Sequence, residues 1–305
     1  MFPLRKALPM RLEIQHEKDM NSSGPDMVGD WPKISIVTPC YNQVKFIERT
    51  IRSVLDQQYP NLEYIIIDGG STDGSVGIIK KYQDKLTYWV SEKDHGQTHA
   101  INKGFYQATG DIVAWLNSDD EYCPGALKTV ARTFMADKKL DFVFGDELAI
   151  DEDGSLIRAG RFTRFNFSAF IVLGMTFQQC TAFWKRELFE KHGYLDESKR
   201  FCMDYEFFCR VGQYIHTRYV RRYLGRFRWH RESKSTTIQD VRLQEQAALK
   251  EQYLQAACKG YPVWLVCLWA YAYRAFWYTL QGDGLYILRG IVRRLLPKCL
   301  RPKWL

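Results

Sequence analysis

Between residues 33 and 120, short apolar runs alternate with segments whose apolar residues recur at helical spacing. The runs at 34–38 and 62–68 predict strands, and the segment 44–57 between them predicts a helix. Strands that alternate with helices of this length form βαβ units with right-handed crossovers. The chain is therefore expected to fold as an α/β protein, with a Rossmann-like, mainly parallel mixed sheet flanked by helices.

Beyond residue 120 the pattern becomes mixed. Asp153 and Gly154 predict a hairpin turn. Residues 161–180 are rich in aromatics and show no clear period, which suits a substrate-facing loop and a buried connection equally well. The further elements that the pattern predicts are strands at 86–90, 112–116 and 142–145 and helices at 97–108, 126–135 and 183–191.

The run at 112–116 contains five consecutive apolar residues, which predicts a strand buried on both faces. Asp119 and Asp120 follow it. Adjacent carboxylates repel each other unless a cation lies between them, and hard divalent cations take oxygen ligands that are often shared with substrate phosphates. An acidic turn before the next helix, with Pro124 at the first helical position, is the alternative.

Polar residues also end the two earlier strands, with Thr38 on the first and Asp68 on the second. In open α/β sheets, ligands bind beyond the carboxyl ends of the strands. Three strand ends that carry polar side chains to one edge favour a ligand site over a capping turn.

Composition narrows the class of protein. The 305 residues are 46% hydrophobic and 15% aromatic, which excludes global disorder. The net charge of +8 and the pI near 9.0 indicate anionic partners: nucleic acid, phosphorylated substrates or an acidic membrane surface. The eight cysteines form no CxxC pair, which indicates reduced thiols, and no signal peptide is recognisable, so a cytoplasmic protein is expected.

Two features of the second half carry charge. Asp204 lies at the start of a segment with helical periodicity, where an aspartate commonly caps the helix, although a partly desolvated carboxylate in a cleft would take a proton from a hydroxyl. Residues 218–234 are rich in arginine, which is typical of a strand or loop with a basic outer face, and no nucleic-acid motif accompanies them. Beside a leaving pyrophosphate, His230 and Arg231 would stabilise negative charge.

Six short motifs together resemble the inverting, nucleotide-sugar-dependent glycosyltransferases of family two, which have the GT-A fold. They occur in order and at family-like spacing over about residues 33–236, and the ordered set is far more specific than any one of them. The motifs are TPCYN at 38–42, IDGGSTD at 67–73, DHGQ at 94–97 with NKG at 102–104, NSDD at 117–120, MDYE at 203–206 and HRESKS at 230–235.

The resemblance implies an enzyme of the hexosyltransferase type and a role for each matching residue. Asp204 matches the catalytic base, and Asp119 and Asp120 match the DxD-like element that binds ribose and a Mg²⁺ or Mn²⁺ ion on the diphosphate. His230 is expected to help hold the metal or the diphosphate. The residues expected to bind the nucleotide sugar, UDP-linked, are Thr38, Tyr41, Asn42, Asp68, Asp94, Gln97, Asn102, Lys103, Asn117 and Asp119.

The chain departs from the family pattern at two positions. Asn117 stands where many members have the first aspartate of DxD, so the expected metal site rests on Asp119 and Asp120. Gly69 replaces the second acidic residue that often follows Asp68, which leaves the preferred donor base open.

The C-terminal part predicts helices. Residues 241–257 predict a polar surface helix, and 262–280 are aromatic and apolar but interrupted by Arg274, so they are short of a membrane-spanning helix. A basic cluster follows, formed by Arg289, Arg293, Arg294, Lys298, Arg301 and Lys303. An aromatic helix with a basic tail favours peripheral binding of 262–303 to the inner face of the cytoplasmic membrane, and packing on protein is the alternative.

The expected organisation is a flexible tail at 1–32, a GT-A domain at 33–236 and a helical appendage at 237–305. The expected function is transfer of a sugar to an acceptor hydroxyl, with a lipid-linked acceptor, in cell-surface polysaccharide or lipid-linked oligosaccharide synthesis. The alternatives are a membrane-surface nucleotide-sugar binding protein without turnover and a nucleotidyltransferase on a similar sheet. A Rossmann dehydrogenase is disfavoured because no GxGxxG follows the first strand.

Overall fold

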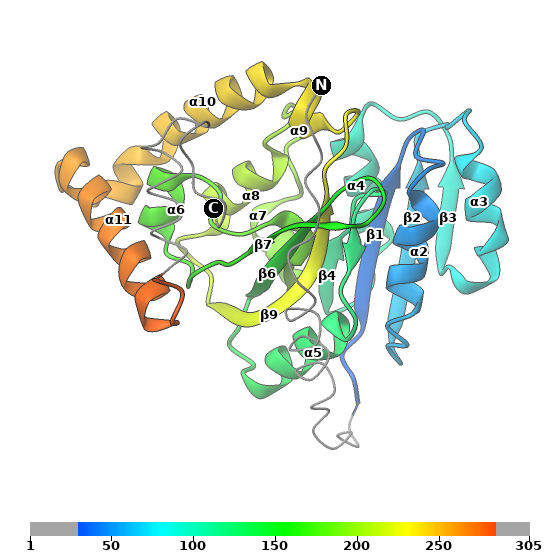
Figure 1. Cartoon of the computed structure of the whole chain (residues 1–305), viewed down its shortest axis with the longest axis horizontal. Coiled ribbons are helices and arrows are strands. Elements are labelled where there is room, and N and C mark those ends of the chain that lie inside the picture. The colour runs from blue at the N-terminus through cyan, green and yellow to red at the C-terminus, as the bar shows by residue number, and fades with distance from the viewer. Residues whose placement is uncertain (1–29, 285–305) are drawn as a thin grey trace. The chain divides into compact units, whose positions relative to one another are not determined.

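The structure is a computed structural model that describes residues 30–284. Four parallel strands form one half of its sheet, in the order β3-β2-β1-β4, and confirm the predicted βαβ alternation (Figure 1). Their bounds are β1 Ile34–Cys40, β2 Leu62–Asp68, β3 Tyr88–Ser91 and β4 Ile112–Trp115. The buried strand predicted at 112–116 is thus confirmed, because all four residues of β4 are buried.

The second half of the sheet mixes strand directions. β8 is antiparallel to both β4 and β6, whereas β6 and β9 run parallel. The turn at Asp153 and Gly154 joins β6 and β7 as the predicted hairpin. The bounds are β5 Glu121–Tyr122, β6 Phe142–Ile150, β7 Leu156–Gly160, β8 Ala182–Lys185 and β9 Thr217–Arg228. The α/β class with a mainly parallel mixed sheet is confirmed.

One predicted element is wrong. The sequence predicts a helix at 183–191, but Ala182–Lys185 is strand β8, and helix α7 covers only Glu187–His192. Phe183 and Trp184 are fully buried between β4 and β6, so pairing on both sides of β8 overrides the local helical spacing. The segment 161–180, which had no readable period, contains helix α6 at Phe167–Leu173 and a short 3₁₀ turn at Gln179–Thr181.

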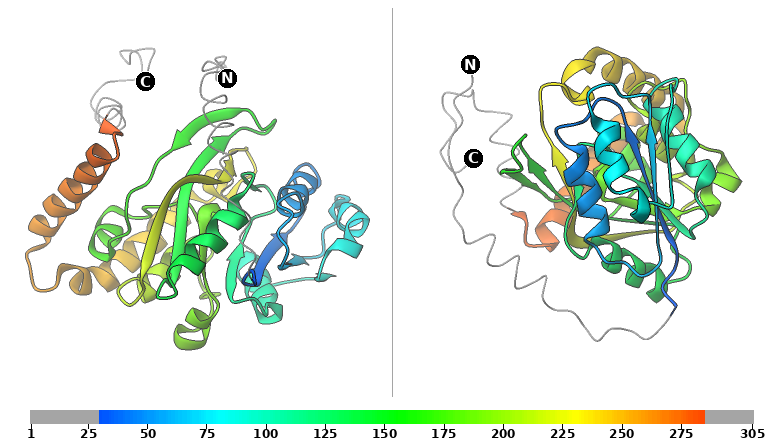
Figure 2. Two further views of the ribbon diagram at one scale, coloured as in Figure 1. Left: turned by 90° about the horizontal axis from the view of Figure 1, so that it is seen from below. Right: turned by 90° about the vertical axis from the view of Figure 1, so that its right-hand side faces the viewer.

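Helices cover the sheet on both sides and along its second half (Figure 2). α10 contacts α6 and α8, and α11 contacts α6, so the predicted appendage packs against the preceding chain. The basic cluster at 289–303 and most of the predicted tail lie outside the described residues, and the proposed domain boundaries stay a prediction. The remaining bounds are α2 Ile47–Leu55, α3 Ser75–Lys81, α4 Gln97–Gln107, α5 Ala126–Ala136, α8 Met203–Val211, α9 Lys234–Thr237, α10 Gln239–Cys258 and α11 Val263–Leu280.

Two close packings fix the elements that border the carboxyl edge of the sheet. At Gly104, a Cβ atom would overlap the side chain of Val37, so α4 lies directly on β1 and its first residue, Gln97, reaches the sheet edge. On the opposite part of the sheet, Phe208 of α8 packs on Phe142 and Phe177 in an aromatic cluster. Each buried aromatic removes about 150–250 Å² from water. This packing holds α8, with Asp204 in its first turn, against the sheet.

Candidate functional site

A cleft of about 1160 Å³ lies at the carboxyl ends of β1 and β4. Its lining includes residues that follow these strands, the first turn of α8 and side chains of α10. Pockets for one small molecule usually measure roughly 300–1000 Å³. The cleft is therefore large enough for two substrates side by side.

The structure brings seven of the predicted site residues to this cleft: Tyr41, Asp94, Gln97, Asn117, Asp119, Asp120 and Asp204. Gln97 and Asn117 are linked, because the side-chain amide of Gln97 donates to Asn117 Oδ1 over 2.8 Å. Asp94 accepts from the backbone N–H of Gly96 over 2.8 Å. Its carboxylate also fills the space that a Cβ at Gly69 would occupy, so an acidic side chain at 69 would clash with Asp94.

Six predicted residues do not line the cleft: His230, which lines an adjacent pocket, and five residues that bind other protein groups. Thr38 is fully buried with its hydroxyl 3.1 Å from that of Tyr64. Asp68 accepts from the backbone N–H groups of Gly70 and Ser71 over 3.0 and 2.9 Å, so it shapes the turn after β2. The other three also bind protein groups: Asn42 accepts from Thr72 N, Asn102 bonds with the backbone of Leu195, and Lys103 pairs with Glu92.

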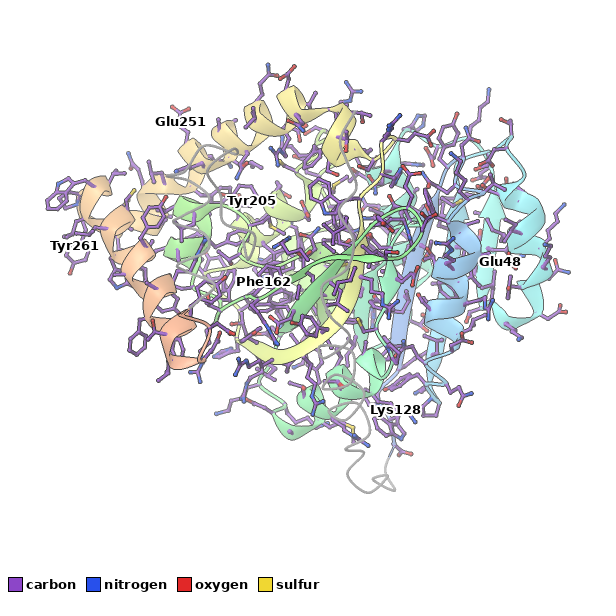
Figure 3. The ribbon with its side chains drawn as sticks, in the orientation of Figure 1. Glu48, Lys128, Phe162, Tyr205, Glu251 and Tyr261 are labelled. Carbon is purple, nitrogen blue, oxygen red and sulfur yellow. The ribbon has the colours of Figure 1, made fainter. Side chains whose placement is uncertain are left out.

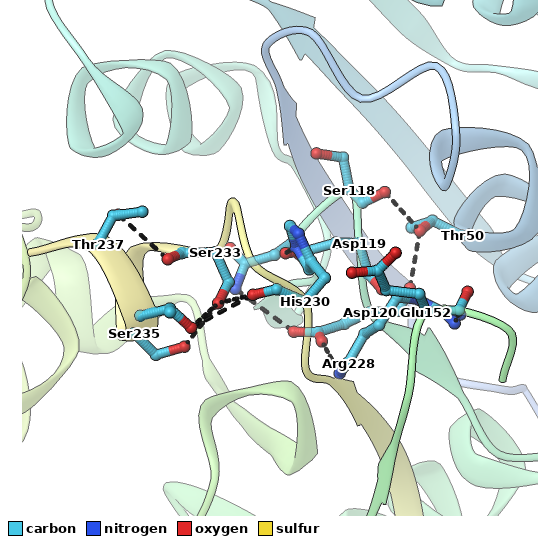
Figure 4. Close-up of polar contacts among 12 residues, drawn as sticks. Thr50, Ser118, Asp119, Asp120, Glu152, Arg228, His230, Ser233, Ser235 and Thr237 are labelled. Carbon is cyan, nitrogen blue, oxygen red and sulfur yellow. Dashed lines mark hydrogen bonds and ion pairs between the residues drawn. The ribbon is translucent and has the colours of Figure 1, made fainter. Parts of the chain in front are cut away.

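Asp119 and His230 form the centre of the site (Figure 4). His230 Nε2 lies 2.8 Å from Asp119 Oδ2, and His230 also lines a smaller pocket of about 290 Å³ next to Phe46 and Lys45. The ring of Phe46 lies 4.8 Å from the His230 ring, which limits the orientations open to the imidazole. The pair therefore joins the end of β4 to the end of β9.

Asp120 borders the same cleft but is almost fully buried, and it has a supporting role. It is 1% exposed and accepts from the backbone N–H of Arg228 over 2.9 Å. Burial, followed by the neighbouring negative charge of Asp119, raises the pKa of Asp120. The Arg228 guanidinium in turn donates to the carbonyl of Asp119 over 2.8 Å and pairs with Glu121. These contacts fasten β9 to the acidic turn and bring His230 beside Asp119.

The donor set fits a hard divalent cation. Among residues 30–284 no group of three or more His, Cys, Asp and Glu side chains is placed to enclose a metal ion. Mg²⁺ binds through one or two carboxylates plus substrate phosphates and keeps several waters, and Mn²⁺ also favours oxygen ligands. The Asp119 carboxylate lines a cleft with room for a diphosphate, and the His230 imidazole beside it lines the adjacent smaller pocket, so the pair satisfies this requirement.

Asp204 offers a proton acceptor. It lies in the first turn of α8, is partly buried, and lines the cleft. Burial raises its pKa to about 6, and the negative charge of Glu245 adds to the rise. Its Oδ1 accepts from the backbone N–H of Tyr205 over 2.7 Å, which leaves the second oxygen for a substrate. A carboxyl with a pKa near neutrality suits general-base chemistry.

The cleft also contains residues that the sequence did not point to. Gln179 comes from the stretch without a period and donates to the carbonyl of Trp115 over 2.7 Å. Arg242 and Gln246 come from α10, which was predicted only as a polar surface helix. No local signal marks these residues, because their role arises from contacts between segments that are distant in the sequence.

Comparison with known proteins agrees with this geometry. Residues 35–193 match the family described as Glycosyl transferase family 2. A GalNAc(5)-diNAcBac-PP-undecaprenol beta-1,3-glucosyltransferase of Campylobacter jejuni is 32% identical over 129 residues, which cover 41% of this chain and 41% of that protein. The chain spans less than two thirds of most such relatives, for example 40% of a glycosyltransferase of Nostoc sp..

Two solved structures share the fold. The TarS 1–349 complex of S. aureus with UDP-GlcNAc superimposes with a TM-score of 0.58 and 18% identity, over 75% of this chain and 73% of that one. The mannosyltransferase PcManGT of Pyrobaculum calidifontis, in complex with GDP-Man and Mn²⁺, gives a TM-score of 0.51 and 18% identity over 94% of each chain.

Proposed function

Because the chain belongs to glycosyl transferase family 2 and is a glycosyltransferase, we propose that it moves a sugar from a UDP-linked donor to an acceptor hydroxyl with inversion. The observation that carries this proposal is the single cleft that both Asp119 and Asp204 line. Asp119 is suited to bind a cation on a diphosphate, and Asp204 is suited to accept the proton of an incoming hydroxyl. The family assignment sets aside a binding protein without turnover and a nucleotidyltransferase.

The nucleotide lies along the ends of β1, β2 and β4 in this proposal. Asp94, Gln97 and Asn117 face it, and Tyr41, which is 62% exposed, lies beside the base. Thr38, Asn42 and Asp68 hold the strand ends and the turn at 69–74 on which the base rests. Asn102 and Lys103 contribute indirectly, because their contacts with Leu195 and Glu92 hold α4, which carries Gln97, in place. The UDP-GlcNAc complex of TarS supports a UDP-linked donor.

Asp119 and His230 would hold Mg²⁺ or Mn²⁺, with Asp120 fixing the turn that carries Asp119. When bound, the cation neutralises charge on the departing diphosphate. The Mn²⁺ in the structure of PcManGT supports this role.

Asp204 performs the proton transfer. Its free carboxylate oxygen removes the proton of the acceptor hydroxyl as the hydroxyl oxygen bonds to the anomeric carbon. The bond from that carbon to the diphosphate oxygen breaks, and its electron pair leaves with the nucleoside diphosphate. Because attack and departure occur on opposite faces, one displacement inverts the anomeric configuration.

The exposed face of α11 points to the location of the acceptor. Among residues 30–284 the structure has no helix that is long and apolar enough to cross a membrane. Only one side of α11 packs on α6 (Figure 2). The outer face consists of large apolar side chains, each at least 39% exposed: Val263, Trp264, Leu265, Leu268, Trp269, Tyr271, Phe276 and Leu280.

We propose that this face lies on an anionic membrane surface. Its tryptophans and tyrosine favour the lipid–water interface, and the sequence continues from α11 into six arginines and lysines between 289 and 303. α6, on which α11 packs, ends at Leu173, a residue that lines the cleft. A lipid-linked acceptor would thus bring its sugar to the cleft while its lipid stays in the membrane. Such acceptors are used in cell-surface polysaccharide or lipid-linked oligosaccharide synthesis. The undecaprenol-linked substrate named for the Campylobacter relative supports this acceptor class.

Thermal unfolding with nucleotides and metal tests the proposed donor site. At one hundred times Kd, UDP with Mn²⁺ stabilises the protein by about 2.7 kcal/mol, which raises Tm by about 5 °C. Asp119→Asn and His230→Gln are expected to lose the part of the shift that needs Mn²⁺, because each removes a ligand. Asp56→Asn, an exposed aspartate after α2, serves as the control and retains the full shift. An unchanged Mn²⁺ effect in both site variants would contradict the assignment.

A further inference from the structure

Glu245, in α10, reaches across to the segment that precedes α8. Its carboxylate accepts three backbone hydrogen bonds, from Arg200 over 2.8 Å, Phe201 over 3.0 Å and Cys202 over 2.8 Å. The first N–H groups of a helix have no partner within the helix, and a carboxylate near them also complements the helix dipole. A side chain more than forty positions away thus binds the segment that leads into α8, including the N–H of its N-cap residue, Cys202.

Within the first turn of α8, the Asp204 carboxylate accepts the backbone N–H of Tyr205 over 2.7 Å. Cys202, the residue before the helix, makes no side-chain capping bond, and its thiol instead lies 3.7 Å from the carbonyl of Arg242. Lys234 donates to the carbonyl of Arg200 over 3.1 Å. The segment 200–202 is therefore held from both sides by residues that follow β9. Asp204 lies two residues beyond this segment, in the first turn of α8.

We propose that Glu245 is a positioning residue for glycosyl transfer, which fixes Asp204 in the cleft and sets the pH range in which Asp204 accepts a proton. This inference rests on the proposed role of Asp204 as the base. It also assigns α10, which lies outside the segment that matches the family, a part in the active site.

The charges around Asp204 come from several elements. Glu245 and Arg242 lie on α10, Lys234 on α9, and Lys199 and Arg200 in the loop before α8. Burial is the first cause of the raised pKa of Asp204, and the negative charge of Glu245 is the only side-chain charge that contributes to the rise. Removing that charge lowers the pKa of Asp204, so the base stays ionised to lower pH.

Glu245→Gln is the sharpest variant, because it keeps the shape of the side chain and removes its charge. Glu251→Gln is the matched control: Glu251 lies on the same helix, is exposed, and points away from the protein in Figure 3. In wild-type protein we expect kcat/KM to fall as the pH drops through about 6. In Glu245→Gln this acid limb moves to lower pH by about half a unit, because the base no longer faces a like charge.

Two further measurements, kcat and the KM for the donor, distinguish a positioning role of Glu245 from a role in folding alone. Glu245→Gln is expected to lower kcat about tenfold, since Asp204 is held less tightly, and to leave KM for the donor and the Tm shift with UDP within about twofold. Glu251→Gln changes none of these quantities. An acid limb that stays in place in Glu245→Gln, or moves equally in Glu251→Gln, overturns the proposal. If the wild-type acid limb persists in Asp204→Asn, the assigned base itself is wrong, which is a different failure.

Discussion

Asp204→Asn is expected to lower the rate of sugar transfer by about 10²–10⁴-fold, the usual contribution of a general base. The amide has the shape of the carboxyl and still accepts the backbone N–H of Tyr205, so α8 keeps its position. It does not take up the acceptor proton. Binding of UDP is expected to remain, because Asp204 contributes to proton transfer and not to the nucleotide site. Steady-state turnover and UDP titration measure the two quantities separately.

The control for this variant is Asp240→Asn. Asp240 also lies in the first turn of a helix, α10, but it is exposed. The Asp240→Asn variant therefore loses only the interaction of a carboxylate with the helix dipole, which contributes about 0.3–1 kcal/mol to stability, and it keeps the proposed base. Substantial residual turnover in Asp204→Asn, or an equal loss in Asp240→Asn, would remove Asp204 from the mechanism.

Trp264→Glu combined with Leu268→Glu is expected to abolish binding to anionic vesicles. The two side chains are 68% and 62% exposed and lie one turn apart on α11. Full burial of a side chain of this size in an apolar phase contributes about 1.5–3 kcal/mol, so the pair accounts for at least a hundredfold in vesicle affinity. The new carboxylates also repel anionic headgroups. Co-flotation with vesicles of anionic lipid measures the loss.

Leu243→Glu is the matched control, because Leu243 is 56% exposed on the neighbouring helix α10. It is expected to float like the wild-type protein, and all variants are expected to bind UDP equally. The membrane proposal would be contradicted if the wild-type protein did not bind anionic vesicles. If the wild-type protein is a dimer in solution and the α11 variant is a monomer, the exposed face of α11 binds a second copy of the chain instead of a membrane.

The first half of the fold was predictable because its signals are local. Each of β1, β2 and α4 has its own apolar period and ends at a polar turn, so their bounds agree with the sequence to within a few residues. β8 was not predictable, because its strand conformation depends on pairing with β4 and β6. α6 was missed because it is apolar on nearly every side, as expected for a helix covered by both α10 and α11.

The site was predictable in part, through the short motifs that carry the family resemblance. These motifs predict Asp119 and Asp204 in one site, and both line the same cleft in the structure. Sequence alone gives no means to separate Asp119 from Asp120, since the burial of Asp120 and its contact with the Arg228 backbone depend on how β9 folds back onto this turn. Glu245 had no signal at all. Its role comes from backbone groups at 200–202, which a sequence pattern does not reveal.

The central claim is a single inverting displacement assisted by Asp204. The measurement that tests it most directly is the anomeric configuration of the released or transferred sugar. The protein is incubated with Mg²⁺ and the α-linked UDP-sugar that stabilises it most, and proton NMR follows the first product before the free sugar equilibrates. We predict that the β-anomer forms first and that Asp204→Asn forms it about 10²–10⁴-fold more slowly. First formation of the α-anomer would contradict a single displacement with Asp204 as its base.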